Sequence, residues 1–214
     1  MHSRVTLVAR RDRLPHMDCR GGIAARLTAP DTVHLVSAAA TPLGGDSIGV
    51  QVIVEEGAVL RLRSAAAAVA LPGAATRTSH ARWRLEVAGE LDVDLEPTVV
   101  AADARHLCSV ALQLHPDTRI RLRERVQIGR SGERHGFWSG SLCADVGDSP
   151  LLRHRVELGA GSVADDALAA PRASVSELRY PANGFTADAW PGSTVLALAG
   201  GGALRTWQGQ RLRG

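Results

Sequence analysis

The chain contains no lysine and few aromatic side chains. All 25 of its cationic side chains are arginine, and 22 acidic residues leave a net charge of only +3 over 214 residues. A charge this close to neutral does not give the basic footprint of a nucleic-acid-binding protein. With two phenylalanines, one tyrosine and four tryptophans, the chain also lacks the stacking surfaces on which single-strand binders hold bases. The composition therefore argues against a nucleic-acid partner.

Cysteine and long apolar runs are scarce as well. Cys19, Cys108 and Cys143 are odd in number and far apart, so we do not expect a disulfide framework. The opening stretch MHSRVTLVARRDRLPH has no apolar core like that of a secretion signal. No stretch approaches the roughly 18 apolar residues that a membrane helix needs. We therefore expect a soluble, cytoplasmic protein without a membrane partner.

The stretch TPLGGDSIGV, residues 41–50, places two glycines in a polar step between apolar segments. A phosphate-binding P-loop needs a lysine and then a serine or threonine after its second glycine. Here Gly45 is followed by Asp46, whose carboxylate would repel a phosphate. The sequence therefore favours a turn that presents a carboxylate.

Strict alternation of apolar and polar residues predicts strands along most of the chain. RWRLEV (82–87) and LDVDLE (91–96) each place apolar side chains on one face and charges on the other. A three-residue loop over 88–90 keeps apolar opposite apolar, so we predict a hairpin with Gly89 in the left-handed position. In this register Arg84 lies across from Asp94, and Arg82 across from Glu96.

RIRLRERVQI (119–128) is predicted as a strand whose Ile120, Leu122, Val126 and Ile128 face inward. SIGVQVIVEEGAVLRLRS (47–64) predicts two strands around a turn at 55–57. Further strands are expected at 4–10, 23–28, 32–37, 107–113, 137–146, 151–158 and 194–199. Such spacing indicates an all-β fold, as a sandwich, a barrel or a coiled sheet with antiparallel or mixed pairing.

The last quarter of the chain has a different pattern. SVADDALAA (162–170) resembles a capped helix that stops before Pro171, and ALRTWQGQRLR (203–213) has apolar residues at roughly helical spacing. We therefore predict one or two short C-terminal helices. Since no linker separates two domains, we expect a single domain over 1–214, with a β-rich body at 1–160 and a helix-containing part at 161–214.

A search for catalytic motifs finds none that is complete. GRSGE (129–133) lacks the spacing of the G-x-S-x-G nucleophile turn. His106 and Cys108 share one face of a strand and offer two metal ligands, but no paired C-x-x-C motif accompanies them. The alternative role of Cys108 is that of a small core residue.

Two charged clusters are candidate binding features. The arginine ladder Arg119, Arg121, Arg123 and Arg125 suits an acidic partner, because four neighbouring like charges gain from an acidic counterpart. Its alternative is a solvated strand face that discourages edge association. The cluster Asp92, Asp94 and Glu96 suits hard cations, and its alternative is cross-strand pairing with arginines.

Positions 33 to 161 resemble the urease accessory protein family UreD, also called UreH. LVSAAATPLGGDSIGVQVIVEEGAVLRLRS (35–64) follows the family's pattern of a GGD turn and two strands around an acidic turn. LDVDLEPTVVAADAR (91–105), RLRERVQIGRSGERHG (121–136) and SPLLRHRVELGAG (149–161) match three further motifs in the same order. The chain departs from the family at SAAAAVALPG (64–73), and Glu96 stands at the position of an aspartate.

The resemblance implies a non-enzymatic chaperone with a β-rich fold. Family members bind apo-urease and the accessory proteins UreF and UreG, and are thought to give nickel a passage toward the urease active site. Asp46, Glu96 and Glu133 stand at motif-matching positions and become candidate transient nickel ligands. The resemblance implies no stably bound cofactor, with nickel only in transit.

Two other classes of function stay open at the level of sequence. One is a β-rich hydrolase or lyase that uses paired carboxylates in a groove, although the scarcity of aromatics speaks against a sugar-binding face. The other is a generic β-sandwich binding module with no role in metal handling.

Overall fold

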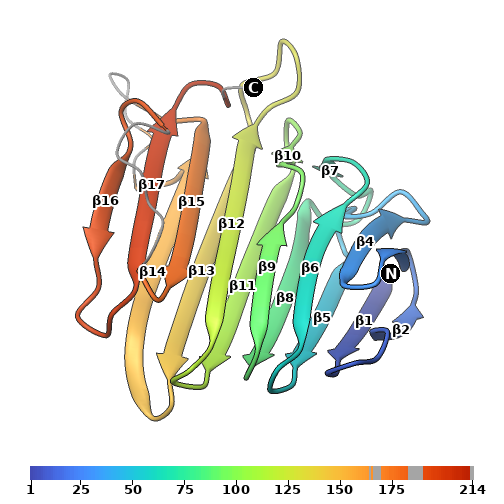
Figure 1. Cartoon of the computed structure of the whole chain (residues 1–214). Helices are drawn as coiled ribbons and strands as arrows, with labels where there is room; N and C mark the ends of the chain where they lie inside the picture. The colour runs from blue at the N-terminus through green and yellow to red at the C-terminus, as the bar shows by residue number, and fades with distance from the viewer. Residues whose placement is uncertain (164, 166–169, 183–189, 213–214) are drawn as a thin grey trace.

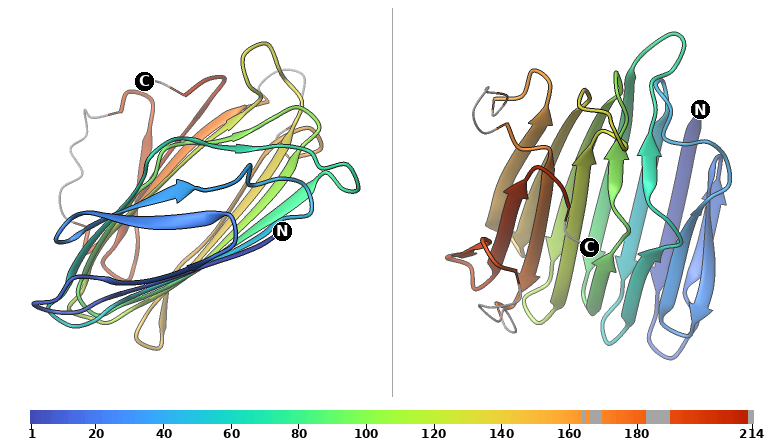
Figure 2. Two further views of the ribbon diagram at one scale, coloured as in Figure 1. Left: turned by 90° about the vertical axis from the view of Figure 1, so that its right-hand side faces the viewer. Right: turned by 90° about the horizontal axis from the view of Figure 1, so that it is seen from above.

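The computed structural model is a two-layered, all-β molecule, which confirms the predicted fold class (Figure 1). It describes residues 1–163, 165, 170–182 and 190–212. A seven-stranded sheet and a ten-stranded sheet lie face to face, as the side and top views of Figure 2 show. Within the described residues, no helix is long and apolar enough to cross a membrane.

The seven-stranded sheet has the order β14-β13-β11-β8-β5-β1-β2. Its strands, in chain order, are β1 (His2–Ala9), β2 (His16–Arg20), β5 (Ser47–Val54), β8 (Thr78–Val87), β11 (Arg105–Leu114), β13 (Phe137–Val146) and β14 (Ser149–Gly159). The ten-stranded sheet has the order β16-β17-β15-β12-β9-β6-β4-β3, with β10 paired with β12 and β7 paired with β10. Its strands are β3 (Ile23–Ala29), β4 (Thr32–Ser37), β6 (Val59–Ser64), β7 (Ala68–Ala70), β9 (Glu90–Asp94), β10 (Thr98–Val100), β12 (Arg119–Ile128), β15 (Ala173–Tyr180), β16 (Thr194–Ala197) and β17 (Ala203–Gly209).

The middle of the chain coils between the two sheets. β5, β8 and β11 lie parallel in one sheet, and β6, β9 and β12, which follow them in the sequence, lie parallel in the other. Corner turns therefore stack on one another: the Ala88 amide donates to the Val54 carbonyl, and the His115 amide donates to the Val87 carbonyl. The similar sequences VEEGAVLRL (54–62) and VAGELDVDL (87–95) form equivalent corners of successive coils.

The predicted hairpin over 82–96 is wrong. β8 and β9 present the expected faces, but they lie in different sheets and do not pair. The alternating pattern fixes which side chains face the core, and a turn that crosses between sheets satisfies it as well as a hairpin does. Gly89 is not left-handed. A Cβ there would lie 2.3 Å from the Ala58 carbonyl oxygen, so the close approach of the preceding corner at 55–58 requires a glycine at this position.

The predicted C-terminal helix over 203–213 is also wrong. Residues Ala203–Gly209 form β17, which pairs antiparallel with β15 and β16. Ala203, Leu204 and Arg205 are all buried, so the strand has no clean alternation and its apolar spacing resembles a helix. The other predicted helix, over 162–170, lies mostly outside the described residues. The turn over 41–50 is confirmed, with Gly45 at φ 93°.

The ten-stranded sheet is interrupted in two of its coils. β6 ends at Ser64 and β7 begins at Ala68, while β9 ends at Asp94 and β10 begins at Thr98. The neighbouring strand β12 runs through without a break, pairing first with β9 and then with β10. The buried apolar side chains form two clusters, a large one and a small one around Val100, Ile128 and Trp138. Cys108 packs against both.

Candidate functional site

An interior cavity of about 310 Å³ lies between the two sheets, next to the interruption of the ten-stranded sheet. Its walls are mainly apolar, and they include the segment 64–68 and residues Leu95, Glu96 and Thr98. Since Ala65, Ala66 and Ala67 line the cavity and are also solvent-exposed, the cavity reaches the surface at this interruption.

Glu96, one of the predicted nickel ligands, lies at the surface end of this cavity. Its side chain is 50% exposed and lies 3.9 Å from the Arg125 guanidinium. Its backbone amide donates to the Ser64 hydroxyl at 2.9 Å, which ties the two interrupted coils together. Glu96 thus combines a solvent-exposed side chain with a place in the cavity lining.

A carboxyl and a thiol meet inside the cavity. Glu124 on β12 and Cys108 on β11 belong to opposite sheets, both line the cavity, and their side chains lie close enough to influence each other's pKa. Burial raises the pKa of Glu124 to about 7, against a smaller opposing effect of the thiol. Burial, and then the nearby carboxyl, raise the pKa of Cys108 well above its ordinary value. At neutral pH the pair therefore holds protons that a bound cation can displace.

Two histidines also line the cavity. His106 is buried, and its Nδ1 lies 2.9 Å from the Ser79 hydroxyl. Burial lowers its pKa to about 4, with a further contribution from His80. The Nε2 atom of His154 on β14 is buried without a partner among the described residues, and burial lowers the pKa of this ring as well. The predicted pair thus borders one cavity from the same strand, but the two side chains have different neighbours: the Ser79 hydroxyl for His106 and the Glu124 carboxyl for Cys108.

Asp46 and Glu133 lie in turns and are held by backbone and charged groups. Asp46 is buried and accepts from the Met1 ammonium at 2.6 Å and from the Thr41 hydroxyl and the Leu43 amide, each at 2.9 Å. Burial acts to raise its pKa, but these donors outweigh it and the pKa is lowered. The Asp46 carboxylate therefore makes structural hydrogen bonds that a bound metal ion would have to break, and the same holds for Glu133.

Glu133 closes the turn after β12. Its carboxylate accepts from the Ala102 amide at 2.9 Å, from the Arg130 amide at 3.0 Å and from the Arg130 guanidinium. The Arg130 hydrogen bond is the main cause of a pKa of about 2. Nowhere in the described part of the chain do three or more histidine, cysteine, aspartate or glutamate side chains gather into a metal-binding group. The three predicted ligands are therefore not brought together.

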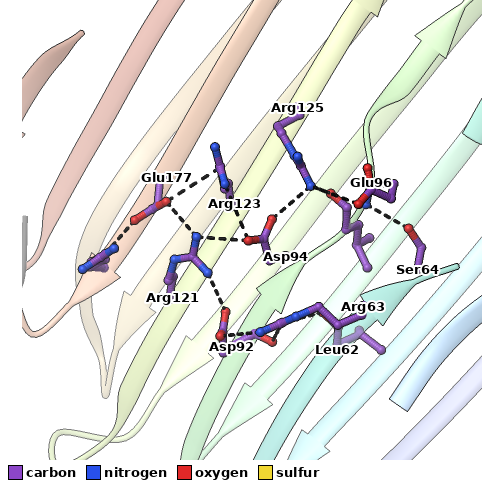
Figure 3. Close-up of polar contacts among 12 residues, drawn as sticks. Leu62, Arg63, Ser64, Asp92, Asp94, Glu96, Arg121, Arg123, Arg125 and Glu177 are labelled. Carbon is purple, nitrogen blue, oxygen red and sulfur yellow. Dashed lines mark hydrogen bonds and ion pairs between the residues drawn. The ribbon is translucent and has the colours of Figure 1, made fainter. Parts of the chain in front are cut away.

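The arginine ladder lies on the outer face of the ten-stranded sheet, within a network of carboxylates (Figure 3). We call this set the outer ionic network; its members are Arg63, Asp92, Asp94, Glu96, Arg121, Arg123, Arg125, Glu177 and Arg179. Asp92 lies 2.7 Å from Arg63 and 3.1 Å from Arg121. Glu177, whose side chain is only 2% exposed, lies 3.2 Å from Arg121 and 2.6 Å from Arg179. The acidic cluster thus pairs with arginines of parallel neighbouring strands, and Arg119 lies exposed at the end of the ladder.

The arginines in the middle of the ladder are not equally compensated. Burial acts to lower the pKa of Arg121, but Glu177 and the two aspartates outweigh it and the pKa is raised. For Arg123, burial and the neighbouring arginines prevail over Asp94, and its pKa is lowered. The ring of Trp190 covers the Arg123 guanidinium at 4.6 Å. The Nε atoms of Arg121, Arg123 and Arg125 are buried without a hydrogen-bond partner among the described residues, although the Arg123 Nε lies 3.9 Å from the Glu177 carboxylate.

Glu124 is the residue that the sequence analysis missed. The predicted inward-facing set of its strand comprises Ile120, Leu122, Val126 and Ile128, and does not include the position between Leu122 and Val126. A charged residue at an inward position of an alternating strand is the signal that would have found it, because buried carboxyls are rare unless they have a partner or a function.

Comparison with known proteins gives one consistent family. The model of the UreD urease accessory protein family matches residues 4–184. Urease accessory protein UreD 1 of Saccharopolyspora erythraea is 38% identical over 195 residues, which cover 87% of this chain and 75% of that protein. The UreD of Frankia alni is 42% identical over 146 residues, 60% of this chain and 49% of its own length. The UreD of Streptomyces coelicolor is 31% identical over 211 residues, which cover 90% of this chain and 82% of that protein.

The chain thus spans three quarters of the first of these relatives and about half of the second. The family match extends over the coils, both interrupted strands and β12, and so includes the outer ionic network and all of the cavity lining except Leu204. The chain therefore belongs to the family of UreD urease accessory proteins.

Proposed function

We propose that this chain is a non-enzymatic, cytoplasmic scaffold that binds apo-urease together with UreF and UreG and lets nickel pass toward the urease active site. Family membership supports the accessory role. The observation that carries the passage is the interior cavity, which reaches the surface beside Glu96 and has a second carboxyl, Glu124, in its interior. Nickel is cargo in this proposal, and the chain keeps no resident cofactor.

The polar groups of the cavity suit weak, transient binding of a metal ion better than stable binding. A conducting path needs ligands that bind weakly enough to release the ion. Glu96 is half exposed, and Glu124 and Cys108 supply two donors where a closed structural site has four. Of the predicted ligands, Glu96 has the strongest support, because it lines the cavity. Asp46 and Glu133 stay predictions, since a metal ion would have to compete there with backbone amides.

Co-expression of the tagged chain with the urease subunits, UreF and UreG tests this function. The proposal expects urease and the accessory proteins to be recovered with the tag, and urease to become active with nickel. Glu96→Gln should leave recovery intact and lower activation. If the folded chain recovers none of these proteins, the scaffold role is wrong, and a hydrolase that uses Glu96 and Glu124 as paired carboxylates becomes the next candidate to assay.

The outer ionic network and Arg119 form the face that we assign to a protein partner. The exposed guanidinium of Arg119 favours a partner that supplies acidic or carbonyl oxygens. Arg119→Glu changes an exposed charge without touching the network, and should lower recovery of the partner at least tenfold through like-charge repulsion. Arg77→Glu, at an exposed ion pair with Asp103, is the matched control and should have no such effect. Equal recovery with both variants would remove the ladder from the interface.

A further inference from the structure

Cys108 lies at a position where the seven-stranded sheet leaves room around a thiol. Its register neighbours are Ala81 on β8 and Gly140 on β13, so no side chain larger than a methyl group flanks it within the sheet. The space in front of Gly140 is taken by the indole of Trp138, which lies 2.2 Å from where a Cβ would be. The thiol therefore has an aromatic ring on one side and the cavity on the other.

Glu124 lies at the interruption of the opposite sheet. On one side its register neighbour is Ser176 of β15. On the other side β9 ends opposite Arg123, and β10 begins opposite Val126, so no strand covers Glu124 there. Glu124 is partly buried and lines the cavity. Among the described residues its side-chain partner is the Cys108 thiol, a weak donor for a carboxyl at this depth.

A buried carboxyl with so weak a partner calls for an explanation, because a paired or apolar side chain would be more favourable here. Thiolate and carboxylate together suit a borderline divalent cation, with the soft sulfur donor favouring Ni²⁺, Co²⁺ or Zn²⁺ over Mg²⁺ or Ca²⁺. Cys108 and Glu124 offer such an ion one donor from each of the opposite sheets. The remaining coordination positions are left for water or for the His154 ring on the same wall.

We propose that Cys108 and Glu124 form a transient binding site for a borderline divalent cation inside the cavity, with Ni²⁺ as its cargo. The choice of Ni²⁺ rests on the proposed function; the site itself rests on the two side chains. A bound cation displaces the thiol proton, and the carboxyl proton where one is present, and these protons leave to water without any transfer of electrons. Glu96 at the surface end and the Cys108 and Glu124 pair inside then form successive steps along one path.

The site is tested on the purified full chain in metal-free buffer by titration with NiCl₂ and, in parallel, CoCl₂. Thiolate coordination gives a charge-transfer absorption band in the near ultraviolet. Cys19→Ser and Cys143→Ser are introduced together, so that Cys108 is the one thiol left and the exposed Cys143 gives no signal. We expect a saturable band in this background, its loss with Cys108→Ser, and affinity at least tenfold weaker with Glu124→Gln.

Alkylation of the thiol gives a second readout that does not depend on absorption. Ni²⁺ should slow the reaction of Cys108 with iodoacetamide at least tenfold, while Mg²⁺ at the same concentration should leave it unchanged. Circular dichroism shows that each variant is folded. A band that survives Cys108→Ser, or alkylation that Ni²⁺ does not slow, overturns the inference.

The failure of this site and the failure of the proposed function are distinguishable. If no band appears but the chain still recovers urease and supports its activation, the scaffold stands and the site is wrong. If the band appears and responds to both substitutions, yet the chain recovers no urease, the site stands and the scaffold role is wrong.

Discussion

At the scale of single residues, the space between the two sheets is lined by several ionisable side chains, although the chain is 45% hydrophobic. His106, Cys108, Glu124 and His154 all border one cavity between the sheets. Each is held where its charged form is disfavoured by burial: the pKa of the two histidines is lowered, and that of the thiol and the carboxyl is raised. Burial therefore disfavours charge at these four groups, and a cation that binds the thiol must displace its proton.

The neutral state of His106 makes a prediction about stability. The unfolded chain binds a proton on this ring at about pH 6.5, whereas the folded chain binds it only near pH 4. The contribution of the neutral ring is thus present above pH 6.5 and is lost as the pH falls from 6.5 to 4, at a cost of about 2 to 3 kcal/mol. Denaturant unfolding of the metal-free chain at several pH values measures it, with His106→Gln as the comparison. An equally steep fall in the variant would show that another group is responsible.

At the scale of elements, the corners where the chain passes between sheets are as tightly specified as the strands. The corner at Gly89 packs on the preceding one so closely that a Cβ would also lie 2.6 Å from the Glu55 carbonyl oxygen. Both contacts are with backbone, which cannot turn aside as a flexible side chain would. The stacking of corners thus fixes the register of the coils.

Gly89→Ala is therefore expected to destabilise the fold by about 2 to 4 kcal/mol, as other forced overpacking does. Gly49 on β5 is the matched control, because a Cβ there meets its nearest atom at an ordinary 3.9 Å. Gly49→Ala should be neutral, or stabilising by up to about 1 kcal/mol, since glycine weakens a strand. Chemical denaturation compares the two, and equal effects would contradict the close stacking at the corner.

The outer ionic network predicts a second difference in stability. Glu177→Gln removes a nearly buried charge that faces Arg121 and Arg179, and should cost about 2 to 3 kcal/mol because buried cations lose their counter-charge. Asp103→Asn removes an exposed partner of Arg77 and should cost less than about 0.5 kcal/mol. Denaturant midpoints measure both. A small effect at Glu177 would mean that solvent already compensates the network.

Sequence patterns predicted the faces of these elements better than their partners. Leu85, Val87 and Leu91 are buried as expected, because alternation is a local property of a strand. The pairing of β8 and β9 was not predictable in this way, since an inter-sheet corner and a hairpin have the same apolar pattern. β17 was mistaken for a helix because both of its faces are buried. Glu96 was found through a family motif, whereas Glu124 needed the position of its strand in the sheet.

At the scale of the whole molecule, the two sheets enclose the cavity and present an outer charged face. The interruption of two coils opens the sandwich beside Ala65, Ala66 and Ala67. These small side chains leave the opening clear. The outer ionic network lies on the exterior of the same sheet, and β12 carries both Glu124 on its inner face and the arginine ladder on its outer face. A partner bound to that face would therefore lie next to the opening.

The central claim is that nickel reaches urease through this cavity, and plugging the cavity tests it directly. Ala66→Trp places a large ring at the opening, while Ala74→Trp places the same ring at an exposed position outside the cavity lining. The measurement is the nickel content of urease that co-purifies with each tagged chain. The account predicts normal recovery of urease with both variants and a nickel content at least fivefold lower with Ala66→Trp alone. Equal nickel content in the two samples would contradict a route through the cavity.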